Sequence, residues 1–266
     1  MLISSVFEIK PKDEVTIPAT NGNFVHAMLL NLIREIDPEL SGMLHKNVKN
    51  KPFTVSPIMG PAVASDKGSH ITLIKDKKYW FRITGLNDEV SSCLMRLNPD
   101  RVVIADEEFE VLGVFREDHE SKEARTTTFE SLYNEWMGKR PADYIKLKFY
   151  SPTTFRVGRK NEPLPLPRLI FCGLIDKWNK YSPVPFDKGL IDLVDEGVIL
   201  SEYNLSTRMY EFGRYRQVGF IGECRFKIKI KEPIWVKILH LLADFSFFAG
   251  VGYKTTMGMG QTKKIV

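Results

Sequence analysis

The amino-acid sequence predicts an α+β fold made of two tandem ferredoxin-like βαββαβ domains, the topology also found in RNA-recognition modules. The first observation behind this prediction is that the order strand, helix, strands, helix, strand occurs before residue 125 and again after it. The second is a period-two alternation in segments such as Tyr144–Tyr150, which is typical of half-buried strands. Hydrophobic residues make up 43% of the 266 residues, enough to fill two modest cores.

The N-terminal domain is expected to span residues 1–125. Apolar residues recur every three to four positions between Asn23 and Lys46, which predicts the first helix, and Asp37-Pro38 marks a break in it. A second helix is expected at Asn87–Leu97. The strands are expected at Leu2–Lys10, Pro52–Ile58, His70–Ile74, Tyr79–Thr84 and Phe109–Phe115.

The C-terminal domain is expected to span residues 126–266, after a polar stretch at 117–125. A short helix at Phe129–Met137 comes first, followed by helices at Pro167–Tyr181 and Ile234–Ala249. Strands are expected at Tyr144–Tyr150, Val198–Leu205, Tyr210–Gly213 and Cys224–Ile230, with a last one at the C-terminus. Alternation puts basic side chains on one face of these strands, namely Lys146, Lys148, Arg225, Lys227, Lys229 and Lys231.

Charge and composition restrict the possible functions. Residues 1–139 hold 17 Lys and Arg against 21 Asp and Glu, whereas residues 140–266 hold 21 against 12, so the second half is the candidate surface for a polyanion. The three cysteines and five histidines are scattered, which predicts reduced thiols and no bound metal or other cofactor. The chain lacks an export signal, and charges interrupt its longest apolar run, so we expect a cytoplasmic protein without a membrane partner.

A glycine-rich turn near the C-terminus is the most distinctive segment. Gly250, Gly252, Gly258 and Gly260 surround Lys254, Thr255 and Thr256, which are groups able to bind a phosphate backbone. The turn is not a nucleotide P-loop, because Tyr253 precedes the lysine, and it is not a dinucleotide fingerprint, because Thr255 stands where the last glycine belongs. A structural turn that closes a sheet is the alternative interpretation.

His45 and Lys51 are the candidate catalytic residues. RNA cleavage without metal needs a general base or acid and a cation for the charge that builds on phosphorus, and this helix-to-strand corner supplies both. A histidine that merely complements the helix dipole is the alternative for His45. His26, in the first turn of the same helix, is the second candidate, with a partly buried structural histidine as its alternative.

A basic turn in the second half could grip phosphates. Arg156, Arg159 and Lys160 lie there after two threonines, and Arg168 begins the next helix. Such contacts position a nucleic-acid strand without reading its sequence. The alternative is a solvated hairpin tip.

Four stretches together resemble the repeat-cleaving CRISPR-associated endoribonucleases, the sixth family of CRISPR-associated proteins. They are HAMLLNLIREIDPEL with LHKNVKNKPFTVSP, then SPTTFR, PLPRLIFCGLIDKWN and FAGVGYKTTMGMGQTK. The resemblance implies two ferredoxin-like domains and metal-independent cleavage of precursor CRISPR RNA within each repeat, leaving a 2′,3′-cyclic phosphate and a 5′-hydroxyl. It implies repeat RNA as the partner, and allows effector-complex subunits or a second copy of the chain as further partners.

The resemblance also implies roles for particular residues. His45 takes the place of the general acid/base histidine, Lys51 that of the lysine that steadies the reacting phosphate, and Lys254, Thr255 and Thr256 contact the RNA backbone. Some members add a tyrosine in the first helix, about where Leu30 stands in this chain. Either His26 substitutes for that tyrosine or the two remaining groups suffice. A non-cleaving repeat-binding subunit is the alternative function, and a nucleotide enzyme is disfavoured because clustered carboxylates for Mg²⁺ are absent from the sequence.

Overall fold

The computed structural model describes residues 1–46, 48–66, 68–187, 189–213 and 215–265. It divides into two compact units. The first unit comprises Met1–Thr126 with Thr256–Gly258, and the second comprises Thr127–Thr255 with Met259–Val266. Each unit contains an antiparallel sheet with helices, and the predicted α+β class with ferredoxin-like domains is confirmed.

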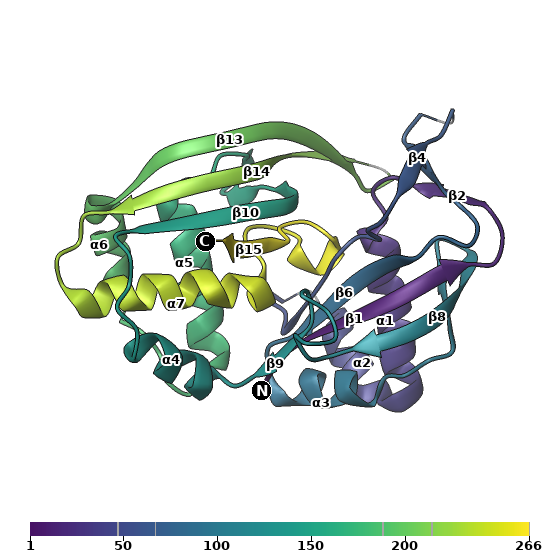
Figure 1. Ribbon diagram of the computed structural model, residues 1–266, viewed down its shortest axis with the longest axis horizontal. Coiled ribbons are helices and arrows are strands. Elements are labelled where there is room, and N and C mark those ends of the chain that lie inside the picture. The colour runs from purple at the N-terminus through teal and green to yellow at the C-terminus, as the bar shows by residue number, and fades with distance from the viewer. Residues whose placement is uncertain (47, 67, 188, 214, 266) are drawn as a thin grey trace. The chain divides into compact units, whose positions relative to one another are not determined.

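The main sheet of the first unit has the strand order β3-β6-β1-β8-β7, of which Figure 1 labels β6, β1 and β8. Without β7 this is the ferredoxin-like order, in which the first strand lies between the third and the fourth, and every pairing is antiparallel. The helices that connect the strands are α1, α2 and α3. Their bounds, with those of the strands, are β1 (Leu2–Pro11), α1 (Gly22–Ile36), α2 (Pro38–His45), β3 (Phe53–Val55), β6 (Tyr79–Gly85), α3 (Asp88–Arg96), β7 (Arg101–Ile104) and β8 (Glu107–Phe115).

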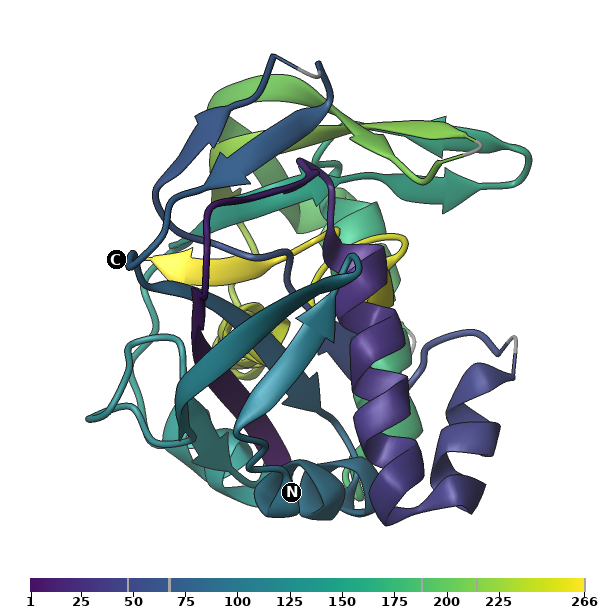
Figure 2. The same ribbon diagram turned by 90° about the vertical axis from the view of Figure 1, so that its right-hand side faces the viewer.

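The first predicted helix is two helices, α1 and α2, which lie side by side in Figure 2. Asp37 ends α1 in an extended conformation, and its carboxylate accepts a hydrogen bond from the Leu40 amide at 2.9 Å to cap α2. Pro38 stands at the first position of α2, where its missing N–H costs no hydrogen bond. The break predicted at Asp37-Pro38 is therefore confirmed.

Several short strands of the first unit were not predicted. β2 (Val15–Pro18), β5 (His70–Leu73) and β4 (Ala62–Ala64) form a separate three-stranded sheet, and β9 (Arg125–Thr127) pairs with β1. Of these, only β5 was expected. The others, like β7, have three or four residues, too few for a period of two to stand out in the sequence.

The second unit contains a four-stranded sheet of order β13-β14-β10-β15, again the ferredoxin-like order. Helices α5 and α7 pack against each other, and α4 packs on α7 (Figure 1). The short α6 follows α5 and was not predicted. The bounds are α4 (Phe129–Met137), β10 (Tyr144–Thr153), α5 (Pro167–Tyr181), α6 (Leu190–Gly197), β13 (Val198–Glu211), β14 (Arg216–Ile228), α7 (Pro233–Ala249) and β15 (Thr262–Ile265).

Burial along β10 alternates as predicted, with Ile145, Leu147 and Phe149 buried and Lys146 and Lys148 turned toward solvent. The prediction for the neighbouring strands was partly wrong. β13 is one continuous strand of 14 residues rather than two, and β14 begins at Arg216 and ends at Ile228. Lys229 and Lys231 therefore lie beyond the strand and do not extend its basic face.

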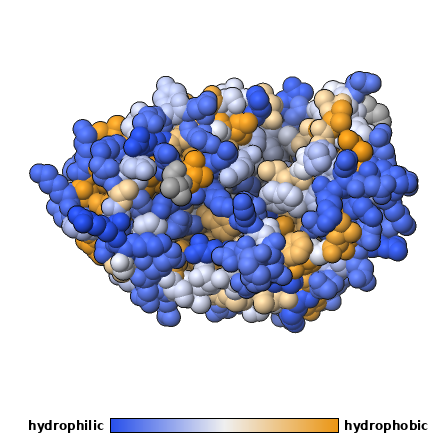
Figure 3. All heavy atoms as spheres, viewed as in Figure 1, coloured by the Kyte–Doolittle hydropathy of each residue, from blue (hydrophilic) through white to orange (hydrophobic). Residues whose placement is uncertain are grey.

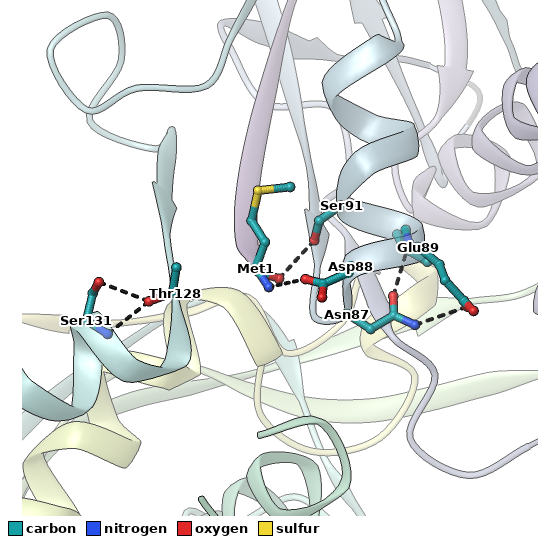
Figure 4. Close-up of polar contacts among 8 residues, drawn as sticks. Met1, Asn87, Asp88, Glu89, Ser91, Thr128 and Ser131 are labelled. Carbon is teal, nitrogen blue, oxygen red and sulfur yellow. Dashed lines mark hydrogen bonds and ion pairs between the residues drawn. The ribbon is translucent and has the colours of Figure 1, made fainter. Parts of the chain in front are cut away.

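Side chains also cap α3 in the first unit and α4 in the second, as Figure 4 shows. Asn87 accepts a hydrogen bond from the Val90 amide at 3.1 Å at the start of α3, in the first unit. Thr128 accepts one from the Ser131 amide at 2.9 Å at the start of α4, in the second. Each of these caps satisfies an amide that the helix leaves unpaired.

The surface drawn in Figure 3 is mostly hydrophilic, with hydrophobic residues in scattered small groups. Among the described residues, no helix is both long and apolar enough to cross a membrane. The three thiols are free: Cys93 and Cys224 are buried, and Cys172 is half-buried. Burial raises the pKa of all three thiols.

Candidate active site

His45 is the last residue of α2, and its side chain is exposed. Its Nδ1 lies 2.9 Å from the carbonyl oxygen of Ser41, one helical turn earlier. Because a carbonyl oxygen only accepts hydrogen bonds, Nδ1 carries the proton in the neutral ring and Nε2 carries the lone pair. Nε2 is therefore the nitrogen that can take up or deliver a proton.

Lys51 lies beside His45 through a backbone contact. Its ammonium group donates to the carbonyl oxygen of Leu44 at 2.6 Å, one residue before the histidine. The last carbonyl groups of a helix have no partner within the helix, so a cation is favourable at this position. Burial lowers the pKa of Lys51. The predicted pair is thus held at one corner, with a cation next to the titratable ring.

His26 reaches the same end of the α1–α2 pair. The hydroxyl of Ser41 donates to the carbonyl oxygen of Leu30 at 2.9 Å, which fixes how the two helices lie along each other. His45 is one turn beyond Ser41 and His26 is one turn before Leu30, so both histidines lie at about the same level. His26 stacks on Phe53 with the ring centroids 5.5 Å apart.

One ring nitrogen of His26 is already engaged in a hydrogen bond to the backbone. Its Nδ1 lies 2.7 Å from the carbonyl oxygen of Thr256, so it donates to the segment Thr256–Gly258, which belongs to the first unit. The structural alternative for this histidine accounts for that contact. Leu30 stands about where some members of the resembled family have a tyrosine. It is only 3% exposed and lies in the core.

The rest of the glycine-rich turn packs on the end of β10. The amide of Tyr253 donates a hydrogen bond to the carbonyl oxygen of Thr154 at 2.8 Å, and the amide of Gly260 donates one to the carbonyl oxygen of Pro152 at 3.1 Å. A Cβ atom on Gly252 would lie 2.4 Å from the Thr154 carbonyl oxygen, and one on Gly260 would lie 2.0 Å from that of Val251. Close packing of backbone on backbone therefore explains these two glycines, in line with the alternative of a structural turn.

Lys177 holds this turn in place through hydrogen bonds from its ammonium group. It was not identified as a functional residue from the sequence. It lies on α5, is 6% exposed, and its ammonium group donates to the carbonyl oxygens of Ala249 and Gly250 and to the Thr255 hydroxyl. Burial lowers the pKa of Lys177 to about 7. The available signal was a lysine on the apolar face of α5, three residues after the buried Leu174.

The position of the Thr255 side chain does not favour its expected role as an RNA contact. Its side chain is 7% exposed, and its hydroxyl already accepts a hydrogen bond from Lys177. The hydroxyl therefore supports the turn instead of facing a ligand.

Lys254 lies in a group of aromatic rings in the second unit. Its ammonium nitrogen lies 4.4 Å from the ring centroid of Phe212, 4.9 Å from that of Tyr215 and 5.3 Å from that of Tyr253. It also donates to the Tyr215 hydroxyl. Its backbone φ of 58° is in the left-handed region, which few non-glycine residues adopt. The aromatic partners of Lys254 were not identified in the sequence.

The basic turn of the second unit is a hairpin of β11 (Phe155–Val157) and β12 (Lys160–Glu162). Arg156, Arg159 and Lys160 are all exposed on it, and Arg156 donates to the Asn161 side chain at 3.2 Å. Arg168, at the start of α5, is also exposed but forms an ion pair with Asp195 of α6. The hairpin thus keeps three basic groups at the surface, whereas Arg168 is already engaged by a carboxylate.

Comparison with known proteins identifies both halves of the chain. The model of the CRISPR Cas6 N-terminal domain matches residues 1–133, and the model described as CRISPR-associated endoribonuclease Cas6 matches residues 147–262. The CRISPR-associated endoribonuclease Cas6 of Streptococcus thermophilus is 28% identical over 122 residues, covering 45% of this chain and 50% of that protein. That of Mycobacterium tuberculosis H37Rv is 32% identical over 118 residues, covering 44% and 37%. The chain therefore spans half or less of the length of these relatives.

Solved structures are similar over the whole chain. A Cas6 product complex is 25% identical with a TM-score of 0.81 and covers 100% of both chains. Thermus thermophilus Cas6 is 24% identical with a TM-score of 0.78 and covers 100% of this chain and 98% of its own. Since the N-terminal family model alone matches half of the sequence and the second model matches most of the rest, this chain belongs to the Cas6 family.

Proposed function

We propose that this protein is an endoribonuclease that cuts precursor CRISPR RNA within its repeats, without metal, to leave a 2′,3′-cyclic phosphate and a 5′-hydroxyl. The observation that carries the proposal is the corner at the end of α2. There Nδ1 of His45 is bonded to Ser41, Nε2 carries the lone pair, and the Lys51 ammonium group is bonded to the carbonyl oxygen one residue away. A relative of the same family was solved as a product complex, which supports RNA as the partner.

The proposed reaction is an attack by the ribose 2′-oxygen on the neighbouring phosphorus. The bond between the 2′-oxygen and phosphorus forms and the bond from phosphorus to the 5′-oxygen breaks, so one proton moves from the 2′-hydroxyl to the leaving oxygen. Nε2 of His45 takes up and returns that proton, and the Lys51 ammonium group stabilises the negative charge on the non-bridging oxygens.

We infer a positioning role for His26. It holds the carbonyl oxygen of Thr256 and so ties Thr256–Gly258 to α1 at the level of His45. In the second unit, the exposed Arg156, Arg159 and Lys160 and the aromatic-bound Lys254 are proposed to contact the RNA backbone. These contacts fix the strand but carry no sequence information.

Cleavage of a labelled repeat RNA in EDTA tests the proposal. His45→Ala should lose about 10²–10⁴ in single-turnover rate, the usual worth of a general acid or base, whereas His119→Ala, an exposed histidine outside the corner, should keep the wild-type rate. Lys51→Met should slow cleavage without abolishing it, with Lys77→Met as its exposed control. Full activity of His45→Ala, or a strict need for divalent metal, would contradict the assignment.

A modified RNA tests whether the ribose 2′-hydroxyl is the nucleophile, and a phosphatase treatment tests which ends the products carry. Replacing the ribose on the 5′ side of the mapped scissile bond by deoxyribose removes the 2′-hydroxyl, so cleavage should stop while binding persists. The upstream fragment should resist phosphatase until acid opens its cyclic phosphate.

A non-cleaving repeat-binding subunit remains the second candidate function. The buried Leu30 favours it, because no phenol is available from this position of α1 to complete a third catalytic group. Tight binding of repeat RNA with no product under single-turnover conditions would decide for this candidate.

A further inference from the structure

The second unit contains a pocket of about 420 Å³ whose lining includes Lys146 of the basic strand face but no residue of the glycine-rich turn or of the β11–β12 hairpin. It lies where the end of α4 and the loop after it meet α7 and the adjacent strands β10 and β15. The residues that line it are Trp136, Lys139, Arg140, Pro141, Ala142, Tyr144, Lys146, His240, Asp244, Lys264 and Ile265.

The pocket is positively charged. Lys139, Arg140, Lys146 and Lys264 line it against the single carboxylate of Asp244. That carboxylate already accepts a hydrogen bond from the Trp136 indole and lies 3.9 Å from the Lys264 ammonium group. Lys139 is also ion-paired with Glu135 outside the lining, at 2.5 Å. Two carboxylates among four cations still leave a net positive field, and a pocket with low-dielectric walls concentrates such a field. The expected occupant is therefore an anion.

The indole of Trp136 forms one wall. The Lys264 nitrogen lies 3.9 Å from its ring centroid and the Lys139 nitrogen 4.7 Å, so the ring holds two ammonium groups over its face. Only 18% of the Lys264 side chain is exposed. Keeping a poorly hydrated cation here costs free energy that an anionic ligand would offset.

His240 adds an acceptor that has no partner. Its ring is 3% exposed and stacks on Trp136 at 4.9 Å. Its Nε2–H donates to the Ala142 carbonyl oxygen at 2.9 Å, so Nδ1 carries the lone pair. Nδ1 is buried and has no hydrogen-bond partner among the described residues. Burial lowers the pKa of His240 to about 4, so the ring is neutral near pH 7 and requires a donor rather than an anion.

We propose that this pocket binds a ribonucleotide, with its phosphate among Lys139, Arg140, Lys146 and Lys264 and a ribose hydroxyl donating to Nδ1 of His240, which the imidazole ring must turn to expose because that atom is buried. The phosphate supplies negative charge where cations outnumber carboxylates, and a hydroxyl is a hydrogen-bond donor that the same molecule carries. The nucleotide is supplied either by a strand of RNA or by the free pool, and both sources present the same chemistry. The proposal does not rest on cleavage at His45, which belongs to the other unit.

The Trp136 indole is a local reporter for the test. The chain has four tryptophans, Trp80, Trp136, Trp178 and Trp235, and ¹⁵N-labelling gives one indole signal for each, assigned by Trp136→Phe. Titration of the full chain with AMP should shift the Trp136 signal in a saturable way and leave the Trp80 signal unchanged. Inorganic phosphate should compete more weakly. 2′,3′-Dideoxy-AMP should bind about three- to tenfold more weakly than AMP, the worth of one hydrogen bond.

Two variants and a matched control test the cations. Lys139→Ala with Arg140→Ala changes two exposed residues, so folding is not at risk, and should weaken AMP binding at least tenfold. Lys180→Ala with Arg208→Ala removes the same charges from exposed sites outside the pocket and should leave binding unchanged. Lys264→Met removes the half-buried cation on its own and should also weaken AMP binding.

Adding repeat RNA to the AMP complex shows whether the bound nucleotide belongs to a strand of RNA or to the free nucleotide pool. Displacement of AMP with a persisting Trp136 shift supports an RNA strand as the occupant, and undisturbed AMP supports the free nucleotide. No Trp136 shift with AMP, phosphate or RNA at concentrations up to about 10 mM, weaker than any specific affinity, would overturn the proposal. Equal losses in the pocket variant and in the control would also overturn it.

Discussion

Replacing Lys177 by methionine tests how the glycine-rich turn is held. Methionine keeps most of the length of the side chain but cannot donate, so the carbonyl oxygens of Ala249 and Gly250 and the Thr255 hydroxyl lose their shared partner. Leaving a buried acceptor unpaired costs about 1–3 kcal/mol, and two carbonyl groups are affected. Against this, the variant no longer has to bury an ammonium group.

The loss of the hydrogen bonds and the relief from burying a charge can be distinguished, because only the second depends on pH. The pKa of Lys177 is lowered from 10.5 to about 7 by burial, and each unit of pKa is worth about 1.4 kcal/mol, so the fall corresponds to about 5 kcal/mol. Between pH 7 and pH 10.5 the unfolded chain holds a proton on this lysine that the folded chain has released. Stability rises with pH wherever the unfolded state binds more protons. The free energy of unfolding of the wild type, relative to Lys177→Met, should therefore increase from pH 7 upward and be lowest below pH 7.

Urea unfolding between pH 6 and pH 9.5, followed by fluorescence of Trp178 on the same helix, measures this difference. Lys180→Met, on the exposed side of α5, controls for the lost charge and the new side chain and should not reproduce the slope. A difference between wild type and Lys177→Met that does not change with pH would refute the reasoning. The same variant should also cleave repeat RNA more slowly at every pH if the turn positions the strand.

Three further results are expected from the structure. Burial lowers the pKa of His240 to about 4, so acidification from pH 6.5 to 4 should destabilise the wild type by up to about 3 kcal/mol relative to His240→Phe, measured by thermal unfolding. Gly252→Ala should cost more stability than Gly158→Ala in urea, because both have a positive φ but only Gly252 meets a backbone oxygen within 3 Å. Asn87→Ala and Thr128→Ala should each cost about 1 kcal/mol, and hydrogen exchange should show the loss in the first unit for Asn87 and in the second for Thr128.

Long, periodic elements were predictable because their side-chain pattern is set by burial. The sequence places α5 at Pro167–Tyr181 and α4 at Phe129–Met137, and the structure has the same bounds. Short strands were not predictable. β4 and β9 have three residues each, and pairing with another strand, rather than a pattern within the segment, makes them strands.

In the candidate site, too, contacts between residues close in the sequence could be predicted, whereas contacts between distant residues could not. His45 and Lys51 could be paired from the sequence because only five residues separate them and a helix end fixes one of them. The contacts that bring His26 to Thr256 and Lys177 to Gly250 join residues 230 and 73 positions apart, which no local spacing encodes. Lys177 was nevertheless detectable as a cation on an apolar helix face, since such a residue must find acceptors when it is buried. A lysine three residues after a buried leucine on the apolar face of a helix therefore indicates a backbone segment that needs a donor, and in this chain that segment is the glycine-rich turn.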